Sequence, residues 1–464
     1  MNYVSTRGKA PVLGFADVLL AGLARDGGLY MPETWPELSP ATLASFAGAP
    51  YAEVATRIMA PFLSGNIDEG DLAAAVDEAY AGFRHPAVVP LRQVADNDWV
   101  LELFHGPTLA FKDVALQVVG RLFDLELRRR GERLTILGAT SGDTGPAAVA
   151  ACRDRDSLDV FILHPADRIS EVQRRQMTTV DAPNVHNLAV DGTFDDCQDL
   201  VKAIFSDLAL REQLRLSAVN SINWARVLPQ AVYYVTAAVA LGAPHRPVAF
   251  SVPTGNFGNA LAGWIAWRMG APISQLVVAS NRNDIATRFL STGVMEVQTV
   301  HPTISPAMDI QVSSNLERLL FELLDRDAPA VTEHMARFSA EGRMEIPVGR
   351  LEQVRRLFDA TTVDDDTASR AMARLHAAGG PLVDPHTAVG LVAGQACRRD
   401  ADVPLVALST AHPAKFPDTV EAATGVRPAL PAHLEHVFEL PERYATLPCD
   451  LATVRDYVVA HARA

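Results

Sequence analysis

Short apolar runs alternate with helical segments over most of this chain, from Trp99 onward. Such alternation is typical of helices packed on mostly parallel sheets. The runs that predict strands are Val100–Phe104, Leu134–Leu137, Val160–Leu163, Val185–Val190, Val248–Val252, Gln275–Ala279 and Leu405–Leu408. The helices expected between them include Asp113–Arg130, Glu171–Val180, Cys197–Phe205 and Trp224–Leu241. The sequence therefore predicts an α/β protein whose sheets are rich in parallel strands.

The region before Pro90 has a different pattern and is predicted to be mainly helical. Phe15, Val18 and Leu19 recur at helical spacing, and an alanine-rich segment follows at 69–83. We therefore expect a mainly helical N-terminal region (1–90), a small α/β domain (91–240) and a large α/β domain (241–464). The large domain would contain a helix-rich segment at 315–376, in which Asp364 caps one helix.

Composition excludes several classes of protein. No apolar run reaches the roughly 18 residues that a membrane-spanning helix needs, and no signal-peptide pattern opens the sequence. The net charge of −14 argues against nucleic acid as a partner. The 4 cysteines have no metal-binding spacing. We expect a cytoplasmic protein with no metal site.

Lys112 is the strongest candidate for chemistry. It follows the apolar turn 109–111 and opens the amphipathic helix expected at 113–130. Burial against Leu109 and Phe111 would lower the pKa of the lysine and favour the neutral amine that Schiff-base chemistry needs. The alternative is a solvated lysine at a helix start, although the helix dipole disfavours a cation there.

Two glycine-containing turns lie between a predicted strand and a predicted helix. The turn Thr254-Gly-Asn-Phe-Gly-Asn259 has the geometry that cradles a phosphate, and it matches neither common nucleotide motif. The turn Thr140-Ser-Gly-Asp-Thr-Gly145 offers hydroxyls and backbone N–H groups that suit a carboxylate or a phosphate. The alternative for this second turn is a simple helix-capping cluster.

Together these segments resemble the threonine synthase family of pyridoxal-phosphate enzymes. The resemblance rests on His-Gly-Pro-Thr-Leu-Ala-Phe-Lys-Asp at 105–113, Ser-Gly-Asp-Thr-Gly at 141–145 and Gly-Asn-Phe-Gly at 255–258. Further similar segments, in the same order, are Asp26–Pro32, Asn220–Arg226, Ser305–Asp309 and Thr410–Phe416. The resemblance implies two doubly wound α/β domains of fold type II. It also implies a lyase that converts O-phospho-L-homoserine and water to L-threonine and phosphate, the last step of threonine biosynthesis.

The resemblance also implies roles for individual residues toward pyridoxal phosphate. Lys112 would hold the cofactor covalently and move protons during γ-elimination and β-hydration. Thr410 would contact the pyridine nitrogen, with Ser409 as the alternative. Asp143 would contact the 3′-oxygen, and its carboxylate leaves the protonation state of that contact open. The cofactor phosphate would lie on the turn formed by Gly255, Asn256, Phe257, Gly258 and Asn259.

The substrate would need a cation for its phosphate, and Arg226 is the best candidate because arginine binds phosphate bidentately. The alternative is an exposed arginine on the helix that begins at Trp224. The other predicted substrate-binding residues are Thr140, Ser141, Gly142, Thr144, Asn220 and Ser221. Arg168 is a weaker candidate. His386 and His412 are acid/base candidates for which a structural role is the alternative, and we do not expect His412 to be a base. Lys415 is interpreted as an ordinary lysine at a helix start.

Other functions remain possible at this point. A serine/threonine dehydratase or a phospho-amino-acid lyase would share Lys112 and the glycine turn, but we do not expect either to carry Asn220–Arg226 and a long N-terminal helical region together. A non-catalytic sensor of amino acids or cofactor is the alternative of a different class. We expect a monomer or a homodimer.

Overall fold

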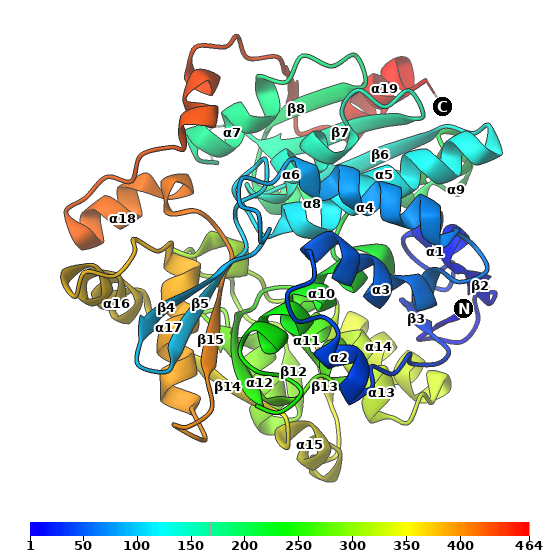
Figure 1. Ribbon diagram of the computed structural model, residues 1–464. Coiled ribbons are helices and arrows are strands. Elements are labelled where there is room, and N and C mark those ends of the chain that lie inside the picture. Colours follow the sequence, from blue (N-terminus) through cyan, green and yellow to red (C-terminus); the bar gives the residue numbers. More distant parts are fainter. Residues whose placement is uncertain (167–168, 464) are drawn as a thin grey trace.

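Two large sheets organise the computed structural model, which describes residues 1–166 and 169–463 (Figure 1). The six-stranded sheet has the order β14-β11-β10-β15-β5-β4, and the five-stranded sheet has the order β16-β8-β7-β6-β9. Only the β4–β5 pair is antiparallel among the neighbouring strands of these two sheets in the described residues. The predicted α/β class, with sheets rich in parallel strands, is confirmed.

The strands match the apolar runs because both faces of each sheet are covered, which buries consecutive side chains. The six-stranded sheet contains β14 (Phe358–Thr362), β11 (Ile273–Ser280), β10 (Val248–Pro253), β15 (Leu405–Ser409), β5 (Asp98–Glu102) and β4 (Leu91–Ala95). The five-stranded sheet contains β16 (Ala445–Pro448), β8 (Val185–Asp191), β7 (Leu158–Pro165), β6 (Leu134–Ala139) and β9 (Leu216–Ser217). Every residue of β7 and β10 is buried.

The helices that matter for the site begin directly after strands or loops at one end of these sheets. They are α5 (Lys112–Arg130), α6 (Thr144–Cys152), α7 (Glu171–Thr178), α10 (Trp224–Ala240), α11 (Gly258–Arg268) and α17 (Pro385–Cys397). The others are α2 (Pro40–Ala44), α8 (Phe194–Ser206), α9 (Leu208–Gln213), α12 (Ile285–Thr292), α13 (Leu316–Leu323), α14 (Ala328–Glu341), α15 (Val348–Arg355), α16 (Asp365–Ala377), α18 (Pro417–Thr424) and α19 (Leu451–His461).

The N-terminal region is helical, as predicted, but it also contains a small sheet. Its longer helices are α1 (Phe15–Ala21), α3 (Tyr51–Leu63) and α4 (Glu69–Ala81). The antiparallel sheet β2-β1-β3 joins Leu13–Gly14, Asn2–Ser5 and Tyr30–Pro32. These strands have two to four residues, which is too short for an alternating pattern to be visible in the sequence.

Each large sheet takes strands from distant parts of the chain. β4 and β5 lie before residue 240 but join the sheet of β10 and β15, while β16 pairs with β8 (Figure 1). A division at residue 240 therefore does not separate the two sheets, and the predicted three-part division of the chain stays a prediction. In the segment 315–376, β14 and the short β13 (Arg343–Glu345) interrupt the expected helices.

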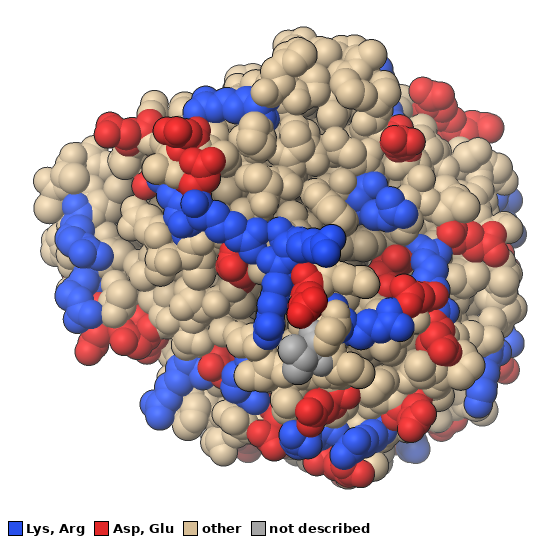
Figure 2. Space-filling model, turned by 90° about the horizontal axis from the view of Figure 1, so that it is seen from below, with Lys and Arg blue, Asp and Glu red and all other residues tan. Residues whose placement is uncertain are grey.

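The described residues contain no helix that could cross a membrane and no group of three or more potential metal ligands. Seen from below, acidic and basic side chains are mixed, and a run of basic side chains crosses the middle of the face (Figure 2). The predicted cap of α16 is confirmed, because the Asp364 carboxylate accepts a hydrogen bond from the Thr367 backbone N–H at 2.7 Å.

Candidate active site

Lys112 lies at the first position of α5, with its amine among other charged groups. Its Nζ is 3.2 Å from Asp143 Oδ2 and 5.1 Å from the centre of the Phe111 ring. The side chain is only 12% exposed. Burial lowers the pKa of Lys112, and the positive charges of Arg226 and Lys415 lower it further, against the opposing effect of Asp143. A lysine with a lowered pKa was expected at this apolar turn.

The loop before Lys112 is folded onto the carboxylate of Asp113. Thr108 donates to Asp113 from its backbone N–H at 2.8 Å and from its hydroxyl at 2.7 Å. A Cβ on Gly106 would lie 2.5 Å from the Cβ of Asp113, so only glycine fits there. Leu109 has a positive φ of 61° and is buried. These contacts explain why Gly106, Thr108 and Asp113 are needed in the segment 105–113. They also fix the start of α5.

Asp143 is held by the turn between β6 and α6. The Thr140 hydroxyl accepts hydrogen bonds from the backbone N–H groups of Gly142 at 3.1 Å and Gly145 at 2.9 Å, so it shapes the turn. A Cβ on Gly142, whose φ is +150°, would lie 2.6 Å from the amide of Gln173. The side chain of Gln173 in turn donates to Asp143 Oδ1 at 2.8 Å. The hydroxyl of Thr140, one of the predicted substrate-binding residues, is therefore already hydrogen-bonded within the turn.

The same turn leaves two hydroxyls near the start of α6. Ser141 is exposed, Thr144 is partly buried, and no side chain caps the helix at Asp143. The first turn of a helix has backbone N–H groups without intrahelical partners, which suits an anionic group of a ligand. The predicted contacts of Ser141 and Thr144 with substrate stay predictions.

Lys415 is a second cation on Asp143, and the interpretation of it as an ordinary lysine at a helix start was wrong. Its Nζ lies 2.9 Å from Asp143 Oδ1 and donates to the Thr108 carbonyl at 2.8 Å. The side chain is fully buried. Burial alone would raise the pKa of Asp143, but Lys112 and Lys415 outweigh it and hold that pKa well below its ordinary value. Between these two lysines Asp143 is a carboxylate, and the protonation state of its predicted contact with the cofactor stays open.

The turn after β10 forms an uncapped helix start. Phe257 has a positive φ of 61°, and α11 begins at Gly258 without a side-chain cap. A Cβ on Gly255 would lie 2.7 Å from the Ala307 carbonyl oxygen, so the close approach of these two segments requires glycine. Asn315 holds the turn by donating to the Asn256 carbonyl at 3.0 Å. Such a helix start has the geometry that binds a phosphate.

Asn259 differs from the rest of this turn. Its side-chain oxygen accepts hydrogen bonds from the hydroxyls of Tyr233 at 2.5 Å and Tyr234 at 2.9 Å, both on α10. The side chain is thus directed into the core between α10 and α11. Its side-chain Nδ2 has no hydrogen-bond partner, and the predicted cofactor contact of Asn259 stays a prediction.

Thr410 and Ser409 lie at the end of β15, next to the turn of Lys112. The Thr410 carbonyl accepts from the Phe111 N–H at 2.9 Å. The Ser409 hydroxyl lies 3.0 Å from the hydroxyl of Thr387, which donates to Asp384. Within the described residues, the Thr410 hydroxyl makes no hydrogen bond. This difference favours Thr410 over Ser409 as the group that faces a ligand.

The two histidines near the site have structural partners. His386 binds Asp384 through Nδ1 at 2.7 Å and accepts from the Ala307 N–H at 3.2 Å through Nε2. Burial lowers the pKa of His412 to about 4, and its Nδ1 accepts from the Ala414 N–H at 3.1 Å. Both contacts agree with the structural interpretation. His386 additionally fixes the Ala307 segment against Gly255, a long-range role that no local motif indicated.

Arg226 lies in the first turn of α10 and is only 4% exposed, so the alternative of an exposed arginine is wrong. Its Nη1 donates to the Val219 carbonyl at 2.7 Å, while its Nε has no hydrogen-bond partner. No carboxylate among the described residues forms an ion pair with it. Burial lowers the pKa of Arg226 to about 10. A buried guanidinium without an anion is costly, so the site is suited to an anionic ligand.

The remaining substrate candidates differ in their exposure. Ser221 is partly buried, and its Cβ lies 3.7 Å from the position of a Cβ on Gly258. Asn220 is exposed, and its side chain accepts from the Ile222 N–H at 3.3 Å. Arg168 lies outside the described residues. The structure thus brings Ser221 to the glycine turn and Arg226 to the neighbourhood of Lys112.

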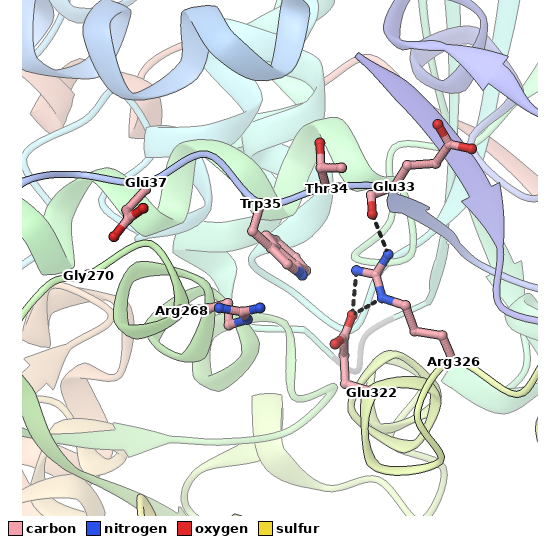
Figure 3. A pocket seen from close by; sticks show the side chains of 8 residues that line it. All are labelled: Glu33, Thr34, Trp35, Glu37, Arg268, Gly270, Glu322 and Arg326. Atoms are coloured by element: carbon pink, nitrogen blue, oxygen red, sulfur yellow. Dashed lines mark hydrogen bonds and ion pairs between the residues drawn. The ribbon is translucent and has the colours of Figure 1, made fainter.

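A surface hollow of about 490 Å³ lies elsewhere, between the segment after β3 and the ends of α11 and α13 (Figure 3). Its central arginine, Arg326, pairs with Glu322 at 2.7 Å and donates to the carbonyls of Pro32 and Glu33. The charges of Arg326 and Glu322 thus satisfy each other, while the buried Trp35 Nε1 in the same hollow has no hydrogen-bond partner.

The residues around Lys112 fit pyridoxal phosphate. A lysine with a lowered pKa lies beside a carboxylate, and a free hydroxyl lies at the end of β15. The glycine turn before α11 starts that helix without a side-chain cap, which leaves its backbone N–H groups for a phosphate. These are an amine for the aldehyde, a neutral partner for the ring nitrogen and a helix start for the phosphate.

Comparison with known proteins agrees with this arrangement. Residues 2–80 match a family model described as threonine synthase N terminus, and residues 387–458 match one described as threonine synthase, C-terminal. Residues 88–340 match the model of pyridoxal-phosphate dependent enzymes. The three matches together span most of the chain in the expected order.

Individual relatives match over nearly their full length. A threonine synthase of Pseudomonas aeruginosa is 55% identical over 99% of this chain and 98% of its own. The crystal structure of a PLP-bound threonine synthase from Brucella melitensis superposes with a TM-score of 0.97 at 52% identity, covering 100% of both chains. The yeast threonine synthase structure gives 0.94 at 38% identity, covering 99% and 98%. The chain therefore belongs to the threonine synthase family of pyridoxal-phosphate enzymes and has its type II fold.

Proposed function

We propose that this enzyme converts O-phospho-L-homoserine and water to L-threonine and inorganic phosphate. The observation that carries the choice of substrate is Arg226, a buried guanidinium without a carboxylate, close enough to Lys112 to lower its pKa. An alkyl phosphate bound there would satisfy the unpaired Nε and bring its carbon chain toward the amine of Lys112.

Pyridoxal phosphate, when bound, supplies an electron-withdrawing system that stabilises negative charge on the substrate carbon next to the amine. Lys112 is the general base for that carbon and for the next one, because its lowered pKa makes a neutral amine available. The same amine, once protonated, returns a proton later in the reaction. Burial of Lys112, Asp143 and Arg226 keeps bulk water away from these transfers.

The other residues bind and orient. When pyridoxal phosphate binds, the backbone N–H groups before α11 would hold its phosphate, and Asp143 would face its 3′-oxygen. Thr410 contacts the ring nitrogen through a neutral hydroxyl, which does not favour protonation of that nitrogen as a carboxylate would. Arg226, with Ser221 and Asn220, holds the substrate phosphate and stabilises the charge that builds up as it leaves.

One assay tests this function. Incubation with O-phospho-L-homoserine should release inorganic phosphate and threonine in equal amounts, and removal of pyridoxal phosphate should abolish both. A 2-oxo acid in place of threonine would instead indicate a dehydratase or a phospho-amino-acid lyase. Binding of substrate without any turnover would indicate a sensor.

We also propose that the protein acts in the cytoplasm, in the last step of threonine biosynthesis, as a monomer or homodimer. The support is the membership of the threonine synthase family. Sedimentation at several protein concentrations measures the oligomeric state, and threonine-free growth of a deletion strain carrying this gene tests the pathway step.

A further inference from the structure

Asp143 lies between two lysines, which is one more cation than a single carboxylate can neutralise. Its Oδ2 faces Lys112 at 3.2 Å and its Oδ1 faces Lys415 at 2.9 Å. Arg226 adds a third positive charge nearby. Because the site is buried, this excess of positive charge is expensive, and it is relieved when one of the cations loses its proton.

The hydrogen-bond partners of Lys112 and Lys415 decide which of the two loses its proton. Lys415 is fully buried, and its three hydrogen-bond acceptors are Asp143, the Thr108 carbonyl at 2.8 Å and the Gln176 side chain at 3.3 Å. An ammonium has three N–H donors, so each one has an acceptor. Lys112 has Asp143 as its only hydrogen-bond partner among the described residues and is partly exposed. The geometry therefore holds the proton on Lys415.

We propose that Lys415 is a positioning residue that occupies Asp143 as a permanent ammonium and so leaves Lys112 as the neutral amine. This proposal rests on the proposed role of Lys112 in the function above. The pKa of Lys112 is lowered first by burial, and Lys415 is among the charges that lower it further. The Thr108 carbonyl completes the arrangement, since the same residue is fixed by Asp113 at the start of the Lys112 helix.

Other charged groups face this cluster from several elements. His386 on α17 helps to lower the pKa of Asp143, and burial raises the pKa of Asp113 on α5 to about 6 while Lys415 opposes that rise. Among the described residues, the titratable or charged groups that interact with the two lysines and Asp143 include Asp113, Arg226, His386 and His412, whose pKa Lys415 helps to lower. Among the charged groups of the described residues, Lys415 is the one that contacts Asp143 Oδ1, an oxygen that the neutral Gln173 side chain also binds, which makes Lys415 the group to change.

The test measures the Lys112 amine without turnover. The full chain, freed of cofactor, is mixed with pyridoxal phosphate, and the rate at which the visible absorption band forms is followed from pH 6 to pH 10. Only the neutral amine attacks the aldehyde, so the midpoint of this rate profile reports the pKa of Lys112. Lys415→Gln and Lys415→Met remove the charge, and glutamine keeps an N–H donor for the Thr108 carbonyl so that folding is preserved. Lys415→Arg keeps the charge.

In both neutral variants the midpoint should move to higher pH, because Asp143 then stabilises the Lys112 ammonium alone. Band formation near neutral pH should slow severalfold, with full amplitude recovered at high pH. Lys415→Arg should keep the wild-type midpoint, as should Lys202→Gln at an exposed lysine that pairs only with Asp199. An unchanged or lower midpoint, or a reduced amplitude at every pH without a shift, would overturn the proposal. Failure of the proposed function would show differently, as a wild-type protein that forms no band or releases no phosphate.

Discussion

Two arginines among the described residues are deeply buried, and of these only Arg318 has a hydrogen-bond partner at each guanidinium nitrogen. Arg318, where α13 meets the N-terminal region, donates to the carbonyls of Tyr30 at 3.1 Å and Ile222 at 2.6 Å and to the Asn315 side chain. Arg226 donates to the Val219 carbonyl and leaves Nε unpaired. The two buried arginines thus differ in their partners. Arg318 finds its hydrogen-bond acceptors within the protein, whereas Arg226 needs an acceptor from a ligand.

The two regions meet at the start of α10. Trp224 packs under Arg318, whose guanidinium carbon lies 5.8 Å from the ring centre, and Arg226 follows two residues later. Asn315 links Arg318 to the glycine turn by donating to the carbonyls of Ser221 and Asn256. The hydrogen bonds around Arg318 therefore help to hold the start of α10, and with it Arg226, in place. Substitution of Arg318 should therefore lower mainly the stability of the fold, whereas substitution of Arg226 should lower mainly catalysis.

The largest effect is expected at Lys112. Lys112→Ala should abolish phosphate release from O-phospho-L-homoserine while still binding pyridoxal phosphate through the turn before α11. Lys112→Arg should not restore activity, because a guanidinium stays protonated. In the wild type, borohydride should fix the cofactor on the peptide that contains Lys112. Mass spectrometry that placed it on Lys415 or Lys202 would refute the assignment.

Arg226→Ala comes next. Loss of a charged, bidentate contact should cost about 3 kcal/mol, roughly a hundredfold in kcat/KM. Because phosphate is the leaving group, kcat should fall as well as KM rise. Thermal unfolding should show equal or higher stability, since an unpaired buried charge has been removed. Near-wild-type kinetics would place the substrate phosphate elsewhere.

Arg318→Met should do the opposite. It leaves carbonyl groups of Tyr30 and Ile222 without their donor, so unfolding by urea should show a loss of about 2–3 kcal/mol. The effect on kcat/KM should stay below about tenfold, since no contact with substrate is lost. A stable variant with the kinetic defect of Arg226→Ala would erase the distinction between the two arginines.

The smallest effect is expected at Ser170, which caps α7. This helix carries Gln173 and Gln176, the partners of Asp143 and Lys415. Ser170→Ala should lower stability by about 1 kcal/mol and kcat/KM only severalfold. Thr193→Ala removes the matching cap of α8, so it should cost similar stability with unchanged kinetics. Equal kinetics in the two variants would show that α7 does not support the site.

Much of the fold could be predicted because it is encoded locally. The seven predicted strands are buried on both faces and read as apolar runs, and the glycine turns read as breaks before helices. β14 and β16 could not be predicted in the same way. Both lie at a sheet edge and are partly exposed, so neither forms an apolar run, and the pairing of β16 with β8 depends on contacts distant in sequence.

The site shows the same limit. Lys112 could be identified because its neighbours in sequence also bury it. Lys415 was misread because its burial depends on Thr108 and Asp143, which lie hundreds of residues away in the chain. Asn259 was counted with its turn, although the hydroxyls of Tyr233 and Tyr234 bind its side chain. Local pattern thus indicated which segments form the site, while tertiary contacts decided which atoms remain available for a ligand.

The pairing of β16 with β8 also sets an order of events during synthesis. Until residues 445–448 emerge from the ribosome, the outer edge of β8 has unpaired backbone groups that could join another chain. Arg463 then bonds Asp159 at 2.6 Å, some 304 positions earlier, and secures the edge. The sheet that presents Asp143 therefore receives its last strand near the end of synthesis, and until then we expect the edge of β8 to be open to pairing with another chain.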